Sequence, residues 1–454
     1  MQKPRPPFSQ ILVFGLGQLG WSLVSFGAAN LLVYYYMPPE AEAGSNNFPS
    51  YIYQGAILGF ATLVGLINFG GRIFDMITDP LIAAWSDRVE SKFGKRKKLM
   101  AIAALPLALF SFLMFWPLTQ SESSTNAAWL VGCILLFYLA FTIYAIPFLA
   151  LVSELGHHPP DRMRISTVIS IAWSIGFLIG SSAYAIQSWL ENYYYYSPEV
   201  AFQWVVGIFA LVSFVLMVIP LVFLQENKYC YQSTTDISAF KSARLIFSNR
   251  NFNFFLVADL MYWLALTFIQ MGISYYVILL FGFDKAMASL FLALGFLCSF
   301  LFYWPINIVV ARTGKKKVVM AAFLTFSLIF AVTVFMPYLP ISKNALFYGL
   351  AISSGFPLAA FGVMPTAIIA DIVYEQEQLT GQQQAGMFYA IRNFMMKAGI
   401  SVANFIFPSL LLMGKSADNP MGVKVSLFLA LLFCALGFFC FSRYKHGSLV
   451  AQSA

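Results

Sequence analysis

The sequence predicts an all-α polytopic membrane protein with twelve transmembrane helices in two six-helix halves. Of its 454 residues, 60% are hydrophobic and only 10% are charged, whereas roughly a quarter of the residues of a soluble globular protein are charged. Apolar stretches of about 20 residues, the length that crosses ~30 Å of hydrocarbon, recur along the whole chain. We expect the spans, in chain order, at residues 11–36, 54–85, 99–118, 128–153, 165–187, 203–224, 252–280, 288–311, 317–337, 345–373, 386–413 and 424–443.

The longest polar interruption marks the boundary between the two halves. It predicts an N-terminal six-helix half at 1–224, a cytoplasmic linker at 225–251 and a C-terminal six-helix half at 252–454. A faint repeat supports this division, because "SDRVESKFGKRKKLM" (86–100) and "VARTGKKKVVM" (310–320) each follow the second span of their half. Paired six-helix halves are typical of transporters, and they predict a substrate site between the halves near the bilayer midplane.

Basic residues predict the orientation of the chain. Most of the 27 Lys and Arg residues fall at the termini and in the even-numbered loops, so the positive-inside rule places both termini in the cytoplasm of a cell (cytoplasmic) membrane. The net charge of +8 then faces an anionic leaflet and calls for no nucleic-acid partner. We expect a monomer, and a first span that is retained because "MQKPRPPF" does not resemble a cleaved signal.

Charged residues inside two of the predicted spans are the main indication of function. Asn68, Arg72, Asp75 and Asp79 step by four, three and four, so they share one helical face. Each charge at a bilayer centre costs roughly 2.5–3.5 kcal/mol, so this face is expected to look into the bundle. A second polar stripe lies in the eleventh span. It consists of Asn393, Lys397, Ser401 and Asn404.

Two acids from one half and a lysine from the other predict a cation site. Carboxylates bind Na+ or H+, and Lys397 would replace the cation in the empty site. The alternative is that these charges only neutralise one another and fasten the helices together. Thr78 and Thr142 are expected to add neutral oxygens to a Na+ shell, although threonine in a membrane helix also bonds its own backbone.

Three blocks of sequence resemble a known family, the glycoside–pentoside–hexuronide:cation symporters, which include the melibiose permeases and have the major facilitator fold. The first block is "GRIFDMITDPLIAAWSDRVESKFGKRKKLM", with Arg72, Asp75, Asp79-Pro80 and Ser86-Asp87-Arg88. The second is residues 364–400, which include Thr380-Gly381 and Lys397-Ala398-Gly399, and the third is "FTIYAIPFLALVSEL" (141–155).

The resemblance implies that Asp75 and Asp79 bind the coupling cation, that Thr142 lies near it, and that Lys397 is the family's lysine of the eleventh span. Thr78 stands where the family often has Asn, so Na+ and H+ both remain open. The sugar-binding half of the pattern is missing. Positions that carry charged or aromatic sugar ligands in melibiose permeases correspond here to Ser22, Ala145, Leu149 and Ile169.

The remaining candidates for the substrate cavity are mostly neutral and aromatic, which suits stacking on a sugar ring or on an amphipathic lysolipid. They are Gln18, Ser22, Asn30, Asn68, Tyr138, Tyr144, Ser170, Trp173, Trp263, Gln270 and Asn393. Asp259, near the start of the seventh span, either lines this cavity or reaches water at the cytoplasmic interface. The sequence supports these two placements equally.

Ion pairs on the cytoplasmic side are expected to gate the transporter. The gate candidates are Asp87, Arg88, Glu154, Asp371 and Glu375, whereas Lys95 to Lys98 are expected to be a solvated basic run. We therefore expect a secondary active symporter that couples Na+ or H+ to a sugar or glycoside-like small molecule by alternating access. A lysolipid transporter and an uncoupled facilitator remain alternatives on the same fold.

An enzyme is not expected. The histidines His157, His158 and His446 fall in loops or the tail, and the five cysteines show no metal or disulfide spacing. We expect no cofactor, and no metal ion beyond a coupling Na+.

Overall fold

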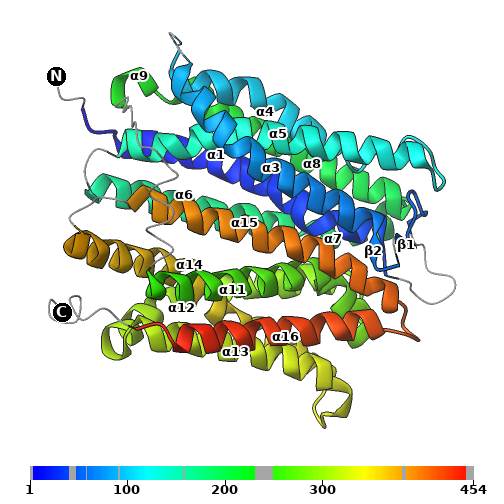
Figure 1. Ribbon diagram of the computed structural model, residues 1–454. Helices are drawn as coiled ribbons and strands as arrows, with labels where there is room; N and C mark the ends of the chain where they lie inside the picture. Colours follow the sequence, from blue (N-terminus) through cyan, green and yellow to red (C-terminus); the bar gives the residue numbers. More distant parts are fainter. Residues whose placement is uncertain are drawn as a thin grey trace. The chain divides into compact units, whose positions relative to one another are not determined.

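The computed structural model describes residues 4–39, 48–57, 59–89, 91, 93–156, 159–230, 249–380 and 385–445. Within these residues the chain forms two compact units (Figure 1). Unit 1 comprises residues 1–235 together with Asp284–Ser289, and unit 2 comprises residues 236–283 and 290–454. The helix that starts at Ala286 therefore has its first turn in unit 1 and the rest of its length in unit 2.

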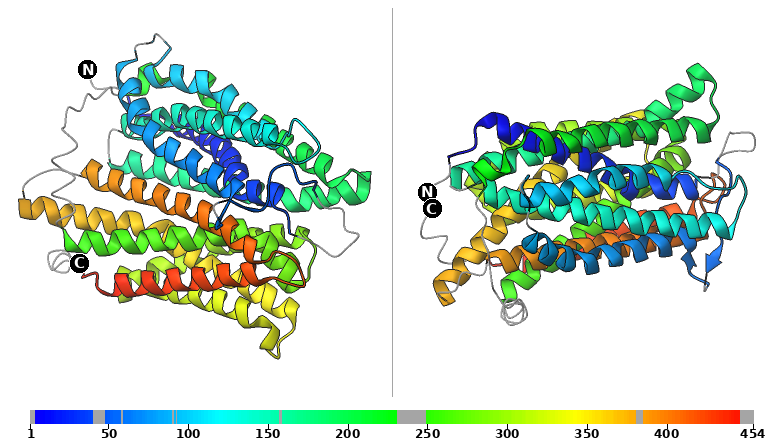
Figure 2. Two further views of the ribbon diagram at one scale, coloured as in Figure 1. Left: turned by 45° about the vertical axis from the view of Figure 1, so that its right-hand side comes forward. Right: turned by 90° about the horizontal axis from the view of Figure 1, so that it is seen from above.

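Unit 1 is a bundle of long helices with one short β-hairpin. Its elements are α1 (Phe8–Phe26), η1 (Gly27–Leu31), α2 (Leu32–Tyr36), β1 (Ala56–Ile57), β2 (Ala61–Thr62), α3 (Leu63–Arg88), α4 (Lys95–Leu113), α5 (Ser124–Leu155), α6 (Pro159–Ser181), α7 (Ala183–Tyr194), α8 (Pro198–Phe223) and α9 (Glu226–Tyr229). The helices α4 and α5 run side by side in all views (Figures 1 and 2), and α1 packs on α6 and α8.

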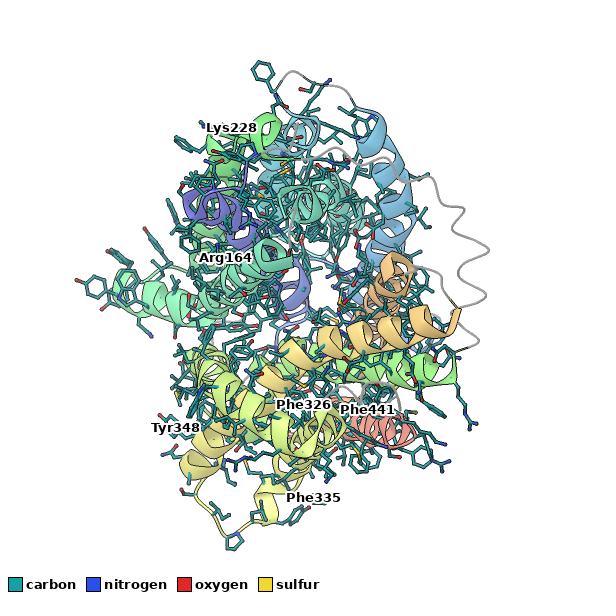
Figure 3. All side chains as sticks on the ribbon, turned by 90° about the vertical axis from the view of Figure 1, so that its left-hand side faces the viewer. Arg164, Lys228, Phe326, Phe335, Tyr348 and Phe441 are labelled. Carbon is teal, nitrogen blue, oxygen red and sulfur yellow. The ribbon has the colours of Figure 1, made fainter. Side chains whose placement is uncertain are left out.

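Unit 2 has the same helical character. Its elements are α11 (Arg250–Tyr275), η2 (Tyr276–Phe281), α12 (Ala286–Thr313), α13 (Lys315–Phe335), η3 (Met336–Tyr338), α14 (Lys343–Thr380), α15 (Ala385–Leu410), η4 (Leu411–Met413) and α16 (Met421–Ser442). Figure 3 places Phe326 and Phe441 inside this unit and Phe335 and Tyr348 at its surface. Large apolar side chains thus lie both in the interior and on the surface of the unit, as expected for helices that span a lipid bilayer.

Ten helical segments in the described part of the chain are long and apolar enough to cross a membrane. The expected spans around α3 and α4 are not among them. The physical reason is their charge, because α3 carries Arg72, Asp75 and Asp79, and α4 opens with Lys95-Arg96-Lys97-Lys98. The multi-pass membrane architecture and the all-α fold class are confirmed.

The second span begins later than the sequence predicted. We expected it to start at residue 54, but Ala56–Ile57 and Ala61–Thr62 pair as antiparallel strands. Gly59 supplies the turn with a φ of +81°, a conformation that glycine adopts without steric cost. The Thr62 side chain then accepts a hydrogen bond from the N–H of Gly65 and caps α3.

Candidate functional site

The polar face of α3 is buried in unit 1. Asn68 and Asp75 are 1% and 0% exposed, while Arg72 and Asp79 are partly buried. The i, i+4, i+7, i+11 spacing predicted from the sequence is therefore the spacing of one interior helix face. Burial of a charged face inside a membrane bundle requires nearby polar partners.

Close packing of α3 on α5 brings such partners to this face. Gly71 lies at the contact, and a Cβ atom added there would overlap the side chains of Ile134 and Tyr138. Small residues at membrane helix interfaces allow two backbones to approach closely. The glycine therefore brings the polar residues of α5 within reach of the α3 carboxylates.

Thr142 on α5 connects to both acids. Its hydroxyl donates a hydrogen bond to Oδ1 of Asp75 at 2.8 Å and lies 3.4 Å from Oδ1 of Asp79. Thr142 is itself 1% exposed. The oxygen atoms of two carboxylates and a hydroxyl thus meet within the contact between α3 and α5.

Arg72 completes the group from the same face of α3. Its Nη1 lies 3.8 Å from Oδ2 of Asp75, and its guanidinium carbon lies 4.9 Å from the centre of the Tyr138 ring. Tyr138, a predicted cavity residue, therefore packs against the arginine. This cation–π contact holds Arg72 beside the carboxylate of Asp75.

Thr78 does not join this cluster through its hydroxyl. Its Oγ1 donates to the carbonyl oxygens of Phe74 and Asp75, at 3.0 and 3.1 Å. This is the ordinary behaviour of threonine in a membrane helix. Of the two threonines predicted to supply neutral oxygens, only Thr142 is directed at the carboxylates.

Several predicted cavity residues of unit 1 are engaged inside the bundle. Gln18 donates to the hydroxyl of Ser22 at 2.8 Å, and Ser22 donates back to the Gln18 carbonyl at 2.7 Å. Tyr144 is fully buried and donates to the carbonyl of Met217 at 3.1 Å. The Tyr144 hydroxyl thereby ties α5 to α8.

Two other aromatic and amide candidates in unit 1 also pack internally. The ring of Trp173 stacks on Phe177 with centroids 4.2 Å apart. Asn30, in the π-helical turn η1, donates to the carbonyl of Phe26 at 3.1 Å. Ser170 is exposed on α6.

The second polar stripe lies on α15 in unit 2. Asn393 is exposed, Lys397 is partly buried, and Ser401 and Asn404 are 1% and 0% exposed. Gly399 packs against α11, where an added Cβ would lie 2.8 Å from Cδ1 of Leu260. On α11 itself, Trp263 and Gln270 are half-buried.

Asp259 is paired with a basic residue inside unit 2. Its carboxylate is 3% exposed and receives two hydrogen bonds from Arg392, from Nε at 3.0 Å and from Nη2 at 3.1 Å. In this bidentate geometry, one planar guanidinium donates a hydrogen bond to each carboxylate oxygen of Asp259. Arg392 was not singled out from the sequence, although an arginine inside the apolar eleventh span was a usable signal.

At the end of unit 1 where α3 leads into α4, here called the basic end, Arg96 forms a buried network. It is 4% exposed, and it donates to Oε1 of Glu154 from Nε at 3.0 Å and from Nη2 at 2.7 Å. A further bond reaches the hydroxyl of Ser86.

The expectation of a solvated run at Lys95 to Lys98 is wrong for Lys95, at 9% exposed, and for Arg96. Arg96 is buried here because the carboxylate of Glu154 on α5 is available to pair with it.

Glu226, which follows α8 in the sequence, caps the N-terminus of α4. Its two carboxylate oxygens accept from the backbone N–H groups of Arg96 and Lys97, each at 2.9 Å. These are helix N-terminal donors that have no partner inside the helix. Gly94, with a φ of +109°, passes so close to Glu226 that a Cβ would overlap its carboxylate.

Unit 2 repeats part of this pattern after Gly314, whose φ is +85°. Lys315 donates to Oδ2 of Asp371 at 2.6 Å, and Lys316 donates to the carbonyl oxygens of Ser442 and Tyr444. In unit 1, Lys97 likewise donates to the carbonyl of Leu224 at the end of α8. The sequence repeat therefore corresponds to a repeated set of contacts.

The remaining gate candidates are placed as follows. Glu375 lies one turn beyond Asp371 on α14. Burial, together with the charges of Asp371 and Glu375, raises the pKa of Tyr444, which follows α16. Asp87 and Arg88 end α3, but their side chains lie outside the described residues, as do His157, His158 and His446.

Comparison with known proteins decides the family. The model of the MFS/sugar transport protein family matches residues 13–442. This chain belongs to that family. The glucuronide carrier protein homolog of Escherichia coli is 25% identical over 84% of this chain and 85% of its own length. The sodium-dependent lysophosphatidylcholine symporter 1 of Xenopus tropicalis is 19% identical over 68% of this chain and 63% of its own.

Solved structures agree on the fold of this MFS protein. The crystal structure of the nucleoside transporter NupG superposes with a TM-score of 0.63 over 96% of this chain and 99% of the other, at 14% identity. The predicted resemblance to the glycoside–pentoside–hexuronide:cation symporters is confirmed at the level of the family. The chain is a transporter of the major facilitator superfamily.

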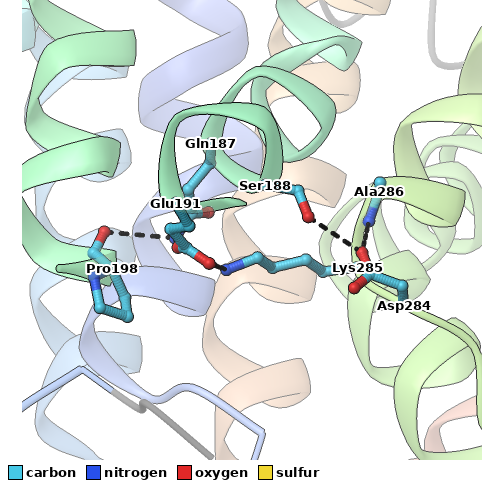
Figure 4. Close-up of polar contacts among 7 residues, drawn as sticks. All are labelled: Gln187, Ser188, Glu191, Pro198, Asp284, Lys285 and Ala286. Carbon is cyan, nitrogen blue, oxygen red and sulfur yellow. Dashed lines mark hydrogen bonds and ion pairs between the residues drawn. The ribbon is translucent and has the colours of Figure 1, made fainter. Parts of the chain in front are cut away.

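A second ion-paired cluster of the MFS chain lies at the end of unit 1 opposite the basic end. Lys285 contacts both carboxylate oxygens of Glu191 on α7, and Ser188 donates to Asp284 at 3.1 Å (Figure 4). Gln187 donates to Glu191 at 2.9 Å. Sequence reasoning missed this cluster because its members lie on α7 and just before α12, 94 and 96 residues apart in the sequence, and follow no common motif.

Proposed function

We propose that this protein is a cation-coupled symporter of the major facilitator superfamily, in which Asp75 and Asp79 hold the coupling cation, Na+ or H+. The proposal rests on the position of Thr142, whose hydroxyl contacts the carboxylate of each acid. Na+ prefers oxygen ligands, and a proton needs a carboxylate that can be buried in its neutral form. This cluster supplies both kinds of group.

The proposed cargo is a sugar or glycoside-like small molecule, carried by alternating access. The family description and the glucuronide carrier relative support this class. Arg72 has a supporting role, since its positive charge would balance the two acids when no cation is bound. Lys397 on α15 is proposed to act in the same way from unit 2.

A lysolipid or other amphipath is the second candidate cargo. It is favoured by the sodium-dependent lysophosphatidylcholine symporter among the relatives and by the apolar residues at positions of the sugar-binding pattern. Of these, Leu149 is 47% exposed and Ala145 is buried. A polyol site needs convergent hydrogen-bonding groups instead.

The basic end of unit 1 and the end of unit 2 where α12 leads into α13 are both proposed to face the cytoplasm, with both termini on that side. The positive-inside rule supports this orientation, because the basic residues after α3 and α12 lie there. The Arg96–Glu154 and Lys315–Asp371 ion pairs would then be cytoplasmic, as proposed for the gate. The Glu191–Lys285 pair would lie on the outside.

Flux into proteoliposomes tests the proposal. Glycosides, pentoses, uronic acids and lysolipids are offered under an inward Na+ gradient, an inward H+ gradient or none, to the wild type and to Asp79→Asn. Accumulation that requires one gradient and disappears in Asp79→Asn would support symport and name ion and cargo together. Equal flux without a gradient, unchanged by Asp79→Asn, would overturn the coupling claim.

A further inference from the structure

An apolar groove on the surface of unit 1 is not used by the proposed transport cycle. It has a volume of about 480 Å³ and lies between α8 and the far end of α4. Such a volume falls within the range of small-molecule sites, about 300–1,000 Å³. Its lining includes Phe112, Trp116, Val200, Trp204, Gly207 and Leu211.

The groove is continuous with the surface that faces the bilayer. Trp116, Trp204 and Leu211 are 47%, 55% and 64% exposed. Below them on the same two helices, Leu105 and Val215 are exposed as well. Since α8 is long and apolar enough to cross the membrane, the medium that touches this groove is lipid.

The length of the groove along α8 matches the thickness of one leaflet of the hydrocarbon core. Its α8 residues run from Val200, near the start of the helix at Pro198, to Leu211. Eleven steps at ~1.5 Å correspond to about 16 Å, and half of the ~30 Å hydrocarbon core is about 15 Å. Two tryptophans flank the upper part, where aromatic residues mark a membrane–water interface.

Polar backbone groups at the end of α4, next to the groove, already have hydrogen-bond donors. The carbonyl of Met114 accepts from the Tyr36 hydroxyl at 2.7 Å, and that of Phe115 from the amide of Gln203 at 3.4 Å. The indole N–H of Trp129 contacts the carbonyls of Leu113 and Trp116. These are helix-end acceptors that otherwise need water or another donor.

The floor of the groove is open because residue 207 is glycine. A Cβ added to Gly207 would lie 3.4 Å from the Phe112 ring, an ordinary contact. Alanine would therefore fit, and a larger side chain would project into the groove.

We propose that this groove binds one acyl chain of a phospholipid from the leaflet opposite the basic end, the outer leaflet in the proposed orientation. Bulk lipid is as apolar as the groove, so retention depends on packing against the two indole rings and the glycine floor rather than on the hydrophobic effect. The occupant is a bilayer phospholipid. This proposal is independent of which cargo the transporter carries.

Native mass spectrometry of the full chain, after reconstitution with one phosphatidylcholine and extraction in detergent, tests the site. Wild type is expected to retain phospholipid, and Gly207→Leu to retain at least fivefold less. Gly132→Leu is the matched control, because Gly132 lies on α5 with no atom within 4 Å of an added Cβ. Equal retention by all three proteins, or none by wild type, would overturn the proposal.

Tryptophan fluorescence locates the bound acyl chain next to a named side chain of the groove. In bilayers of phosphatidylcholine brominated at mid-chain, quenching of wild type is compared with that of Trp204→Phe and of Trp189→Phe. Trp189 is also exposed, on α7, but lies outside the groove. Stronger quenching of Trp204 than of Trp189, reduced toward the Trp189 level by Gly207→Leu, is expected. Equal quenching of the two indoles would overturn the proposal even if lipid co-purifies.

Discussion

Arg392 and Asp259 form a doubly hydrogen-bonded ion pair that joins α15 to α11 inside unit 2. The pair is almost fully buried, at 14% and 3% side-chain exposure. Arg392 lies five residues before Lys397 on α15, so the two basic side chains leave the helix in different directions. The ion pair fixes how α15 is rotated on α11, and thereby which way Lys397 and Asn393 face.

Arg392→Met is expected to destabilise the protein strongly, because it leaves the carboxylate of Asp259 buried without its cation. Breaking a buried pair by removing one partner costs about 3–5 kcal/mol. Thermal unfolding in detergent would show this as a lowered Tm. The double variant Arg392→Met/Asp259→Leu should recover much of the loss, and Arg312→Met, at the exposed end of α12, should change little. A Tm of Arg392→Met equal to that of Arg312→Met would contradict this role.

Thr142→Val is expected to weaken binding of the coupling cation. A hydrogen bond to a charged group contributes about 1.5–3 kcal/mol, so the cation concentration for half-maximal transport should rise about tenfold or more. Thr142→Ser keeps the hydroxyl and should stay near wild type. Thr78→Val is the matched control, since Thr78 bonds its own helix backbone. If Thr78→Val were impaired as much as Thr142→Val, the carboxylate contact would not be the reason.

Gly71→Ala is expected to push α3 away from α5. Overpacking costs about 1–3 kcal/mol, and the shift would also separate Thr142 from Asp75. Both Tm and cation affinity should therefore fall. The neighbouring Gly70→Ala provides the comparison, because an added Cβ there meets no atom within 4 Å. That variant should be neutral or slightly stabilised, as alanine favours helix over glycine. A loss in both variants would indicate a helix-wide effect.

Glu226→Gln is expected to change how stability depends on pH. Burial raises the pKa of Glu226 more than the backbone N–H groups of Arg96 and Lys97 lower it. A carboxyl with a raised folded pKa stabilises the fold most below its ordinary value of 4.5 and loses this contribution as pH rises through the raised value. The Tm difference between variant and wild type should therefore move in the variant's favour as pH increases from 4.5. Glu122→Gln, in an exposed loop, should show no such trend, and a flat difference for Glu226→Gln would contradict the prediction.

Charge reversal at Glu191 and Lys285 is expected to show, through the Tm, that the two side chains stabilise the protein as an ion pair. Glu191→Lys places like charges together and is expected to lower the Tm, and Lys285→Glu should do the same. The double reversal restores opposite charges and should recover part of the loss. Coupling between contacting residues is typically about 0.5–3 kcal/mol. Additive effects of the two reversals would show that the side chains do not interact in the membrane-embedded protein.

The fold was largely predictable because membrane spans leave a strong signal. A run of about 20 apolar residues has few alternatives in hydrocarbon, so the spans were located to within several residues. The exception was the start of α3, where a two-residue hairpin and a threonine cap replaced the expected helical turn. Such short features depend on local turn geometry, which an apolar run does not reveal.

The candidate site was predictable only in part. Helical periodicity places Arg72, Asp75 and Asp79 on one face without knowledge of any neighbour. Thr142 was a candidate together with Thr78, and the family resemblance implied that Thr142 lies near the cation. By contrast, the partners of Arg96 and Asp259 come from distant parts of the sequence, and nothing in the spacing of either residue identifies them. The direction of a hydroxyl, as for Thr78 and Thr142, depends on which helix packs opposite it.

The contact between Glu226 and the start of α4 also bears on the order of biogenesis. Glu226 is made 130 residues after Arg96, when every span of the first half has already been synthesised. Until then the first turn of α4 must rely on water or on lipid headgroups for its N–H groups. Residue 226, at the start of the predicted linker, is thus the point in synthesis after which the first half can complete its folding.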